Sequence, residues 1–96
     1  MSLKQQLRND LKEALKARDE RRKAVIRMAL AAITNAEVAQ GGDLDDDAIV
    51  AVLRKEARRR QDTIAELKRA DRPERLAAEE AELEILQGYL PQLLSR

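Results

Sequence analysis

The sequence predicts an all-α fold, a four-helix bundle-like domain with short connections and a long third helix. Three observations support this prediction. The best helix formers, Ala, Leu, Glu, Lys, Arg and Gln, dominate the 96 residues. Residues that favour pleated sheets are scarce, and Tyr89 is the single aromatic side chain. With only three glycines and two prolines, helices have few interruptions, so residues 1–96 are expected to form one helical domain around a modest core.

The first helix is expected at about residues 2–17. Ser2 and Gln5 have the spacing of a capping box, in which a side-chain oxygen accepts a hydrogen bond from the first helical turn. Leucines then follow at every fourth position from Leu3 to Leu15. This spacing places them on one face of the helix.

The second helix is expected at about residues 20–40, with Asp19 as its N-cap. Its apolar residues recur on one face until Gly41 and Gly42. Glycine readily adopts left-handed backbone conformations, and these conformations commonly end helices. Both glycines are therefore expected in that conformation at the C-terminal end of this helix.

The third helix is expected at about residues 46–70. Asp45 is a good N-cap, the two aspartates after it suit the positive end of the helix dipole, and Leu44 can pack on Ile49. A helix of about 25 residues is about 37 Å long. It is therefore expected to protrude from, or curve around, so small a domain.

The fourth helix is expected at about residues 73–90, because Pro73 suits a first helical turn and Pro91 stops the helix. Its apolar residues lie on more than one side, so it needs more than one partner surface. Leu93 and Leu94 follow close to the end of the chain. These leucines are expected either to fold back on the bundle or to meet another chain.

The chain contains no cysteine and no histidine. This excludes disulfides, thiolate nucleophiles and the two commonest side-chain ligands of transition metals, along with the usual general base near neutral pH. No apolar run approaches the ~20 residues that cross a membrane, and Met1 to Leu7 lack a signal-peptide core. We therefore expect a cytoplasmic protein with no membrane, cofactor or metal requirement.

The net charge of +1 conceals four blocks of alternating sign along the chain. Residues 1–27 carry a net +5, residues 28–53 a net −5, residues 54–75 a net +4 and residues 76–96 a net −3. Alternating blocks on successive antiparallel helices can pair across the bundle. Alternatively, the two basic blocks form one patch that faces a phosphate backbone.

Four charged residues fall within the apolar stripes of the second and third helices: Arg22, Glu37, Glu56 and Arg60. Charged side chains seldom lie there unpaired. We expect Glu56 to pair with Arg60 four residues further on, and Arg22 or Glu37 to pair between helices. Such pairs contribute more to helix register than to net stability. A ligand-facing role is the alternative.

Outward-facing arginines are the candidate nucleic-acid contacts: Arg18, Arg21, Arg27, Arg54, Arg58 and Arg59. On the third helix, Arg54 and Arg58 are four residues apart and can reach phosphates together. With one tyrosine and no other aromatic residue, stacking on unpaired bases is poorly supported. Any RNA contact is therefore expected to be made to the backbone and to overall shape.

Two acidic clusters have ordinary structural explanations. Asp43 to Asp47 open a helix and lack the glycine and glutamate spacing of an EF-hand calcium loop. Glu79 to Glu84 are typical of a solvated helix face. No glycine-rich phosphate loop and no serine nucleophile motif is present. We therefore assign no catalytic residue and no metal ligand.

Four stretches, in this order, carry a family resemblance: MSLKQQLRNDLKEALKARDERR, VIRMALAAITNAEV, VLRKEARRRQDTIAEL and ELEILQGYLPQLLS. Together they resemble the YqeY-like family, whose members are related to the GatB tail of the glutamine-dependent tRNA amidotransferase. The resemblance covers essentially the whole chain. The matched positions are Arg22, Arg27, Asn35, Glu37, Glu56, Arg60, Tyr89, Leu90 and Pro91.

The resemblance implies a fully helical fold and, as in the amidotransferase tail, a role in engaging tRNA. Family members usually continue into a second small helical domain after the Tyr-Leu-Pro segment, whereas this chain stops five residues after Pro91. That second domain is therefore expected to be absent. A carbon–nitrogen ligase label, with glutamine as the amido donor, is implied by homology alone.

The expected function is thus a non-catalytic helical binding module that interacts with tRNA or with a tRNA-processing partner. The alternative is a protein-binding or self-associating module, such as a homodimer formed through the fourth helix and the C-terminal leucines. A third hypothesis is an amidotransferase-like enzyme, which would need glutamine-dependent turnover by this chain alone.

Overall fold

The computed structural model describes residues 2–91 of the 96-residue chain. In this part of the chain, four helices follow one another: α1 (Leu3–Ala17), α2 (Glu20–Gln40), α3 (Asp46–Ala70) and α4 (Pro73–Gln87). The prediction of an all-α fold with short connections and a long third helix is confirmed.

Side-chain caps begin the first three helices at the positions that the sequence indicates. Ser2, Asp19 and Asp45 each accept a hydrogen bond from the backbone N–H three residues further on, at 2.9 to 3.1 Å. These bonds satisfy donors that have no partner within the helix. Helix α4 has no side-chain cap, and Pro73 lies in its first turn, where a missing N–H costs nothing.

Helix α2 ends at Gly41, whose φ of 84° lies in the left-handed region. The expectation that Gly42 shares this conformation is wrong, because Gly41 is the only glycine with positive φ among the described residues. One left-handed residue is enough to end the helix. The N–H groups of Gly41 and Gly42 both donate to the carbonyl of Glu37, at 2.8 and 3.1 Å.

Helix α4 ends at Gln87, three residues before the predicted end at Leu90. A turn follows, in which the N–H of Tyr89 donates to the carbonyl of Leu86 at 3.1 Å and that of Leu90 to Gln87 at 3.0 Å. Glycine at position 88 is a weak helix former, and the residue before a proline is disfavoured in the helical region. Both effects shorten the helix.

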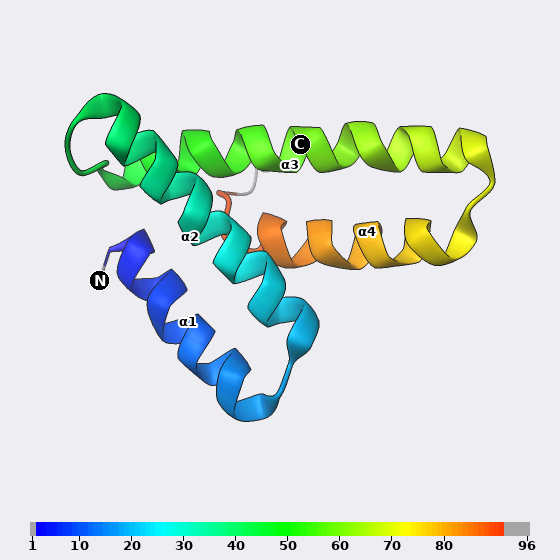
Figure 1. The fold of residues 1–96 in the computed structure, drawn as a ribbon, viewed down its shortest axis with the longest axis horizontal. Helices are drawn as coiled ribbons and strands as arrows, with labels where there is room; N and C mark the ends of the chain where they lie inside the picture. The colour runs from blue at the N-terminus through cyan, green and yellow to red at the C-terminus, as the bar shows by residue number, and fades with distance from the viewer. Residues whose placement is uncertain (1, 92–96) are drawn as a thin grey trace, which may run out of the picture.

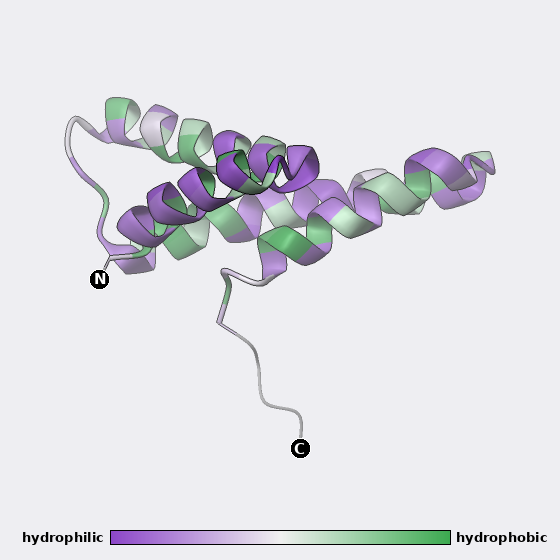
Figure 2. Ribbon diagram, turned by 90° about the horizontal axis from the view of Figure 1, so that it is seen from below, coloured by the Kyte–Doolittle hydropathy of each residue, from purple (hydrophilic) through white to green (hydrophobic). Residues whose placement is uncertain are grey.

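The four helices form two antiparallel hairpins, α1 with α2 and α3 with α4 (Figure 1). Helix α2 runs across α3 and also contacts α4, so it joins the two hairpins. Hydrophobic and hydrophilic residues alternate along every helix (Figure 2), as expected of helices that each bury one face. This arrangement is consistent with the predicted helical bundle.

The core lies where the two hairpins cross. It is a single cluster to which all four helices contribute: Leu7, Val25, Ile26, Ala29, Ile33, Ile49, Leu53, Ala57 and Leu86. Leu44 packs against this cluster, as the sequence predicts. No polar or charged residue of the described chain is buried. Apolar burial of this kind is the main stabilising contribution in a domain of this size.

The outer halves of α3 and α4 extend beyond α1 and α2 (Figure 1), so the long third helix protrudes as expected. Ile64 and Leu67 are buried in this outer part, at 8% and 6% exposure. They lie outside the central cluster. Within the described residues, no helix is both long enough and apolar enough to cross a membrane.

Candidate functional site

The six arginines that the sequence predicts as phosphate contacts are all exposed: Arg18, Arg21, Arg27, Arg54, Arg58 and Arg59. Arg18 ends α1 in a left-handed conformation, with a φ of 56°. Arg21 and Arg27 lie on α2, and the other three lie on α3. Exposure is required for contact with a nucleic acid but does not test it, so their role stays a prediction.

On α3, only two of the three arginines share a face. Arg54 and Arg58 are four residues apart and therefore lie about 40° apart around the helix. Arg59 lies about 100° further round than Arg58, and its Nη1 donates to Glu56 Oε2 at 3.2 Å. Among the described residues, neither Arg54 nor Arg58 forms an ion pair. These two guanidinium groups are therefore not neutralised by residues 2–91.

Arg60 connects α3 to α4. Its Nη1 donates to Glu79 Oε1 at 3.2 Å and to Glu82 Oε1 at 2.6 Å, and the Arg60 side chain is 18% exposed. The predicted pair of Glu56 with Arg60 is therefore wrong. The reason is that α4 presents two carboxylates to Arg60 across the hairpin, while Glu56 pairs with Arg59 instead. Glu79 and Glu82 are likewise half-buried contacts and not part of a fully solvated face.

Glu37 makes the interhelical pair that the sequence predicts as one possibility. Its Oε2 accepts hydrogen bonds from Lys4 Nζ on α1 and from the backbone N–H of Leu44 at 3.1 Å. These donors stabilise the carboxylate and lower the pKa of Glu37 below its usual value. Glu37 thus joins α1, the end of α2 and the loop before α3.

Arg22 also pairs between helices, in a cluster with Asp10 and Tyr89. The Tyr89 hydroxyl donates to Asp10 Oδ2 at 2.5 Å and accepts from Arg22 Nη2 at 3.4 Å. Arg22 Nη2 lies 3.8 Å from the same carboxylate oxygen. Burial and the adjacent Asp10 carboxylate raise the pKa of Tyr89, so its hydroxyl keeps its proton to a higher pH than that of an exposed tyrosine.

The residues that pair with Arg22, Glu37 and Arg60 were not predicted. Two of these partners, Asp10 and Lys4, nevertheless carry a signal in the sequence. Asp10 follows Leu3 by seven residues and Lys4 precedes Leu11 by seven, so each lies about 20° from a stripe leucine. Both residues therefore lie at the edge of the apolar face of α1. Glu79 and Glu82 carry no such signal, because they stand among other glutamates.

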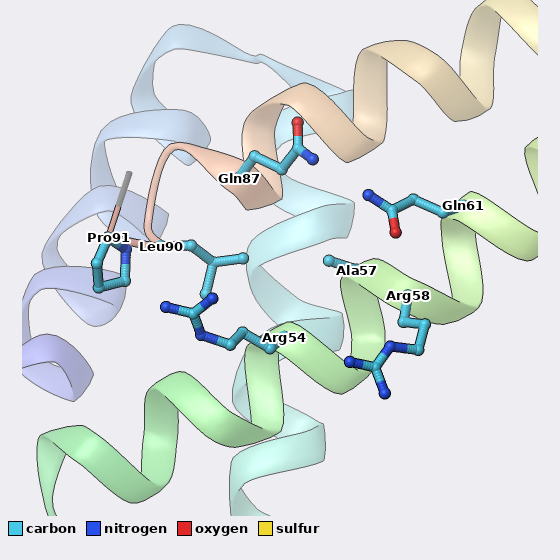
Figure 3. A pocket seen from close by; sticks show the side chains of 7 residues that line it. All are labelled: Arg54, Ala57, Arg58, Gln61, Gln87, Leu90 and Pro91. Atoms are coloured by element: carbon cyan, nitrogen blue, oxygen red, sulfur yellow. The ribbon is translucent and has the colours of Figure 1, made fainter. Parts of the chain in front are cut away.

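A groove lies between α3 and the C-terminal end of α4 (Figure 3). Its volume is about 440 Å³, and it is lined by Arg54, Ala57, Arg58, Gln61, Gln87, Leu90 and Pro91. The groove therefore joins the unpaired arginines of α3 to the predicted family positions Leu90 and Pro91. The groove could not be predicted from the sequence, because it depends on how the turn after α4 lies against α3.

One predicted position of the described chain, Asn35, remains apart from these clusters. Asn35 is exposed on α2, and the structure brings it to none of the sites above. Leu93 and Leu94 lie outside the described residues. Among the described residues, no group of three or more acidic, histidine or cysteine side chains is arranged to hold a metal ion.

The sequence model of the Yqey-like protein family matches residues 4–96. Over 88 residues, the chain is 42% identical to altered inheritance of mitochondria protein 41, mitochondrial, from Lachancea thermotolerans, covering 91% of this chain and 47% of that protein. Proteins of the same name from Saccharomyces cerevisiae (strain YJM789) and Vanderwaltozyma polyspora are 36% and 33% identical, covering 91% of this chain and 48% of each. The chain thus spans about half the length of the curated relatives that it matches.

These relatives correct the expectation of a cytoplasmic protein, because their names describe them as mitochondrial. Composition and a missing signal-peptide core do not distinguish the cytoplasm from an organelle. The predicted family resemblance, by contrast, is confirmed along nearly the whole chain. This chain belongs to the Yqey-like protein family.

Proposed function

We propose that this chain is a non-catalytic helical module that binds structured RNA of the tRNA class through contacts to phosphates. The observation that carries the proposal is the pair of exposed arginines, Arg54 and Arg58, on one face of a long helix. Neither is neutralised by an acidic partner in residues 2–91. Two arginines whose backbones lie about 6 Å apart along a helix can contact neighbouring groups of a phosphate backbone.

The other exposed arginines extend the same type of contact. Arg18 and Arg21 lie at the junction of α1 and α2, and Arg27 lies further along α2. The charges that the bundle needs for its own packing, such as Arg22 and Arg60, are held by acidic partners. Among the described residues, Arg22 and Arg60 are thus paired between helices, whereas Arg18, Arg21 and Arg27 form no ion pair.

Family membership supports tRNA as the ligand class, because the family resembles the tail of a tRNA amidotransferase. The ligase label of that enzyme rests on homology alone and is not part of this proposal. Self-association through α4 has no specific observation in its favour. Leu83, Ile85, Tyr89 and Leu90 are partly buried and pack against the core.

A binding titration against tRNA over a series of salt concentrations tests this proposal. Each phosphate contact contributes about −0.7 to −0.9 to the slope of log K against log salt, because binding releases condensed counterions. The double variant Arg54→Gln/Arg58→Gln should make this slope shallower by about 2. The absence of binding at low salt by the unmodified chain would rule the proposal out.

The matched control is the double variant Arg69→Gln/Arg75→Gln. Arg69 and Arg75 are also exposed, but they lie at the outer end of the α3–α4 hairpin. This variant has the same net charge as Arg54→Gln/Arg58→Gln, so it corrects for the general loss of positive charge. It should retain the slope of the unmodified chain, whereas an equal loss in both variants would argue for nonspecific attraction only.

A further inference from the structure

The groove between α3 and the end of α4 combines three kinds of lining side chain. Arg54 and Arg58 supply cationic donors, Gln61 and Gln87 supply carboxamides, and Leu90 supplies an apolar surface. In Figure 3, Arg54 reaches toward Leu90 while Gln61 points across the groove toward Gln87. Polar groups of two different kinds therefore converge on one concave surface from two helices.

The charge of this lining favours an anionic ligand. None of the residues that line the groove is acidic, and Arg54 and Arg58 form no ion pair within the described chain. A guanidinium group presents a fixed fork of donors that matches phosphate geometry. The arginine end of the groove is thus suited to a phosphate group.

The dimensions of the groove exceed those of a bare phosphate. Its volume of about 440 Å³ falls in the range of about 300 to 1,000 Å³ that is typical of small-molecule sites. Arg54 and Gln61 are seven residues apart, or about 10 Å along the helix. A ligand that reaches both side chains therefore needs an anionic group, such as a phosphate, at one end and a hydrogen-bonding group at the other.

A carboxamide presents a donor and an acceptor side by side, which matches the edge of a nucleobase. The apolar side chain of Leu90 can cover one face of the base, since no aromatic residue lines the groove. We infer that this groove is a binding site for one nucleotide, with its phosphate on Arg54 and Arg58 and its base edge on Gln61.

This inference deepens the proposed function, because an unpaired nucleotide of a bound RNA would be one source of the ligand and a free nucleotide the other. Nuclear magnetic resonance spectra of the isotope-labelled full chain can detect binding of a ligand from either source. The side-chain amide signals of Gln61 report on the groove directly. The first probes are the four nucleoside 5′-monophosphates, with inorganic phosphate and the phosphate-free nucleosides as controls.

A nucleoside monophosphate should shift the backbone signals of residues 54–61 together with the side-chain amide of Gln61. Removal of either the phosphate or the base should weaken binding about tenfold or more, which corresponds to the loss of one good polar contact. The variant Arg54→Gln/Arg58→Gln should lose these shifts, and Arg69→Gln/Arg75→Gln should keep them. The variant Gln61→Leu should bind about fivefold more weakly and should reduce any preference between bases.

Three results would overturn the inference. Inorganic phosphate and nucleotides could bind equally well, which would leave a bare anion site. A polyglutamate peptide could displace the nucleotide at lower concentration, which would indicate an acidic protein partner. The shifts could also be insensitive to the loss of Arg54 and Arg58, which would place the nucleotide elsewhere.

The RNA source is tested with an RNA hairpin that either carries or lacks one unpaired terminal nucleotide. The overhang should strengthen binding to the unmodified chain but not to Gln61→Leu, whose net charge is unchanged. If tRNA binds with a steep salt dependence while no nucleotide perturbs Gln61, this inference fails and the proposed function stands. If free nucleotides occupy the groove while tRNA does not bind, the proposed function fails and the groove remains a nucleotide site.

Discussion

The Tyr89 hydroxyl donates a hydrogen bond to the Asp10 carboxylate across 79 residues of sequence, at 2.5 Å. It also accepts a hydrogen bond from Arg22, so one side chain joins the turn after α4 to α1 and α2. The same turn carries Leu90 and Pro91, which line the groove on α3. The Tyr89 hydroxyl therefore helps to fix the position of one wall of that groove.

Replacement Tyr89→Phe removes the hydroxyl and keeps the ring. We expect the free energy of unfolding to fall by about 1 to 2 kcal/mol, because Asp10 loses a charge-assisted hydrogen bond in a half-buried position. Denaturant unfolding at neutral pH measures this change. In a double-mutant cycle with Asp10→Asn, the two effects should not add, since both remove the same bond; fully additive effects would contradict this explanation.

The raised pKa of Tyr89 predicts that the unmodified chain and Tyr89→Phe differ in how their stability changes at alkaline pH. The pKa of Tyr89 is raised in the folded state above its usual value of 10.0, so the folded chain holds this proton more tightly than the unfolded chain. The contribution of Tyr89 to stability is fully present below pH 10.0, the usual tyrosine pKa. It is lost as the pH rises toward the higher folded-state pKa. From about pH 9 to pH 11, the unmodified chain should lose more stability than Tyr89→Phe, although both lose some as lysines titrate. Parallel curves would show that Tyr89 titrates normally.

Arg60 and Arg59 are adjacent in sequence but should differ strongly in their contribution to stability. Arg60→Met leaves Glu79 and Glu82 close together without their cation, and we expect a loss of about 1 to 3 kcal/mol. Arg59→Met removes a pair whose arginine side chain is 73% exposed, and the loss should be below about 0.5 kcal/mol. Denaturant unfolding of both variants measures the difference. Added salt should partly restore Arg60→Met, because it screens the repulsion between the glutamates; equal losses would show that Arg60 does not act through α4.

Local features of this fold could be predicted from the sequence because they depend on neighbouring residues. Ser2, Asp19 and Asp45 cap their helices, and α3 spans the predicted 46–70, because capping and helical periodicity act within one or two turns. The end of α4 was predicted three residues too late. There, Gly88 and Pro91 act together, and the hydrophobic pattern alone does not show it.

Partners across helices could be predicted only in part. The position of Arg60 within an apolar stripe predicted that it would be paired, and this is correct, but the partner on its own helix was the wrong choice. The choice among acidic residues depends on how far α4 lies from α3, which follows from core packing around Leu53 and Leu86. The groove at Arg54 was not predicted for the same reason, since the turn after α4 forms one of its walls.

Glu37 should make the stability of the folded chain depend on pH in the acid range. Its pKa is lowered in the folded state from the usual 4.5, chiefly by the hydrogen bond from Lys4. The stabilisation is therefore fully present above 4.5 and is lost as the pH falls through the lower folded-state pKa. Between neutral pH and about pH 3, the thermal midpoint of Glu37→Gln should fall less than that of the unmodified chain. Glu13→Gln is the control, because Glu13 is 74% exposed and its pair with Lys16 is 3.8 Å long; the same acid profile in both variants would contradict a specific role for Glu37.

Gly41 and Gly42 provide a direct test of the cost of left-handed backbone. A Cβ atom added to either glycine would meet no atom within 4 Å, so the two positions differ in backbone conformation and not in space. Gly41 has a φ of 84°, which an alanine adopts at a cost of about 1 kcal/mol, whereas Gly42 has no positive φ. Denaturant unfolding should therefore show Gly41→Ala less stable by about that amount, and Gly42→Ala unchanged or slightly more stable, because alanine restricts the unfolded chain. Gly41→Asn should lie between Gly41→Ala and the unmodified chain, since asparagine tolerates this conformation. Equal losses at positions 41 and 42 would mean that the loop after α2 needs both glycines for a reason other than φ.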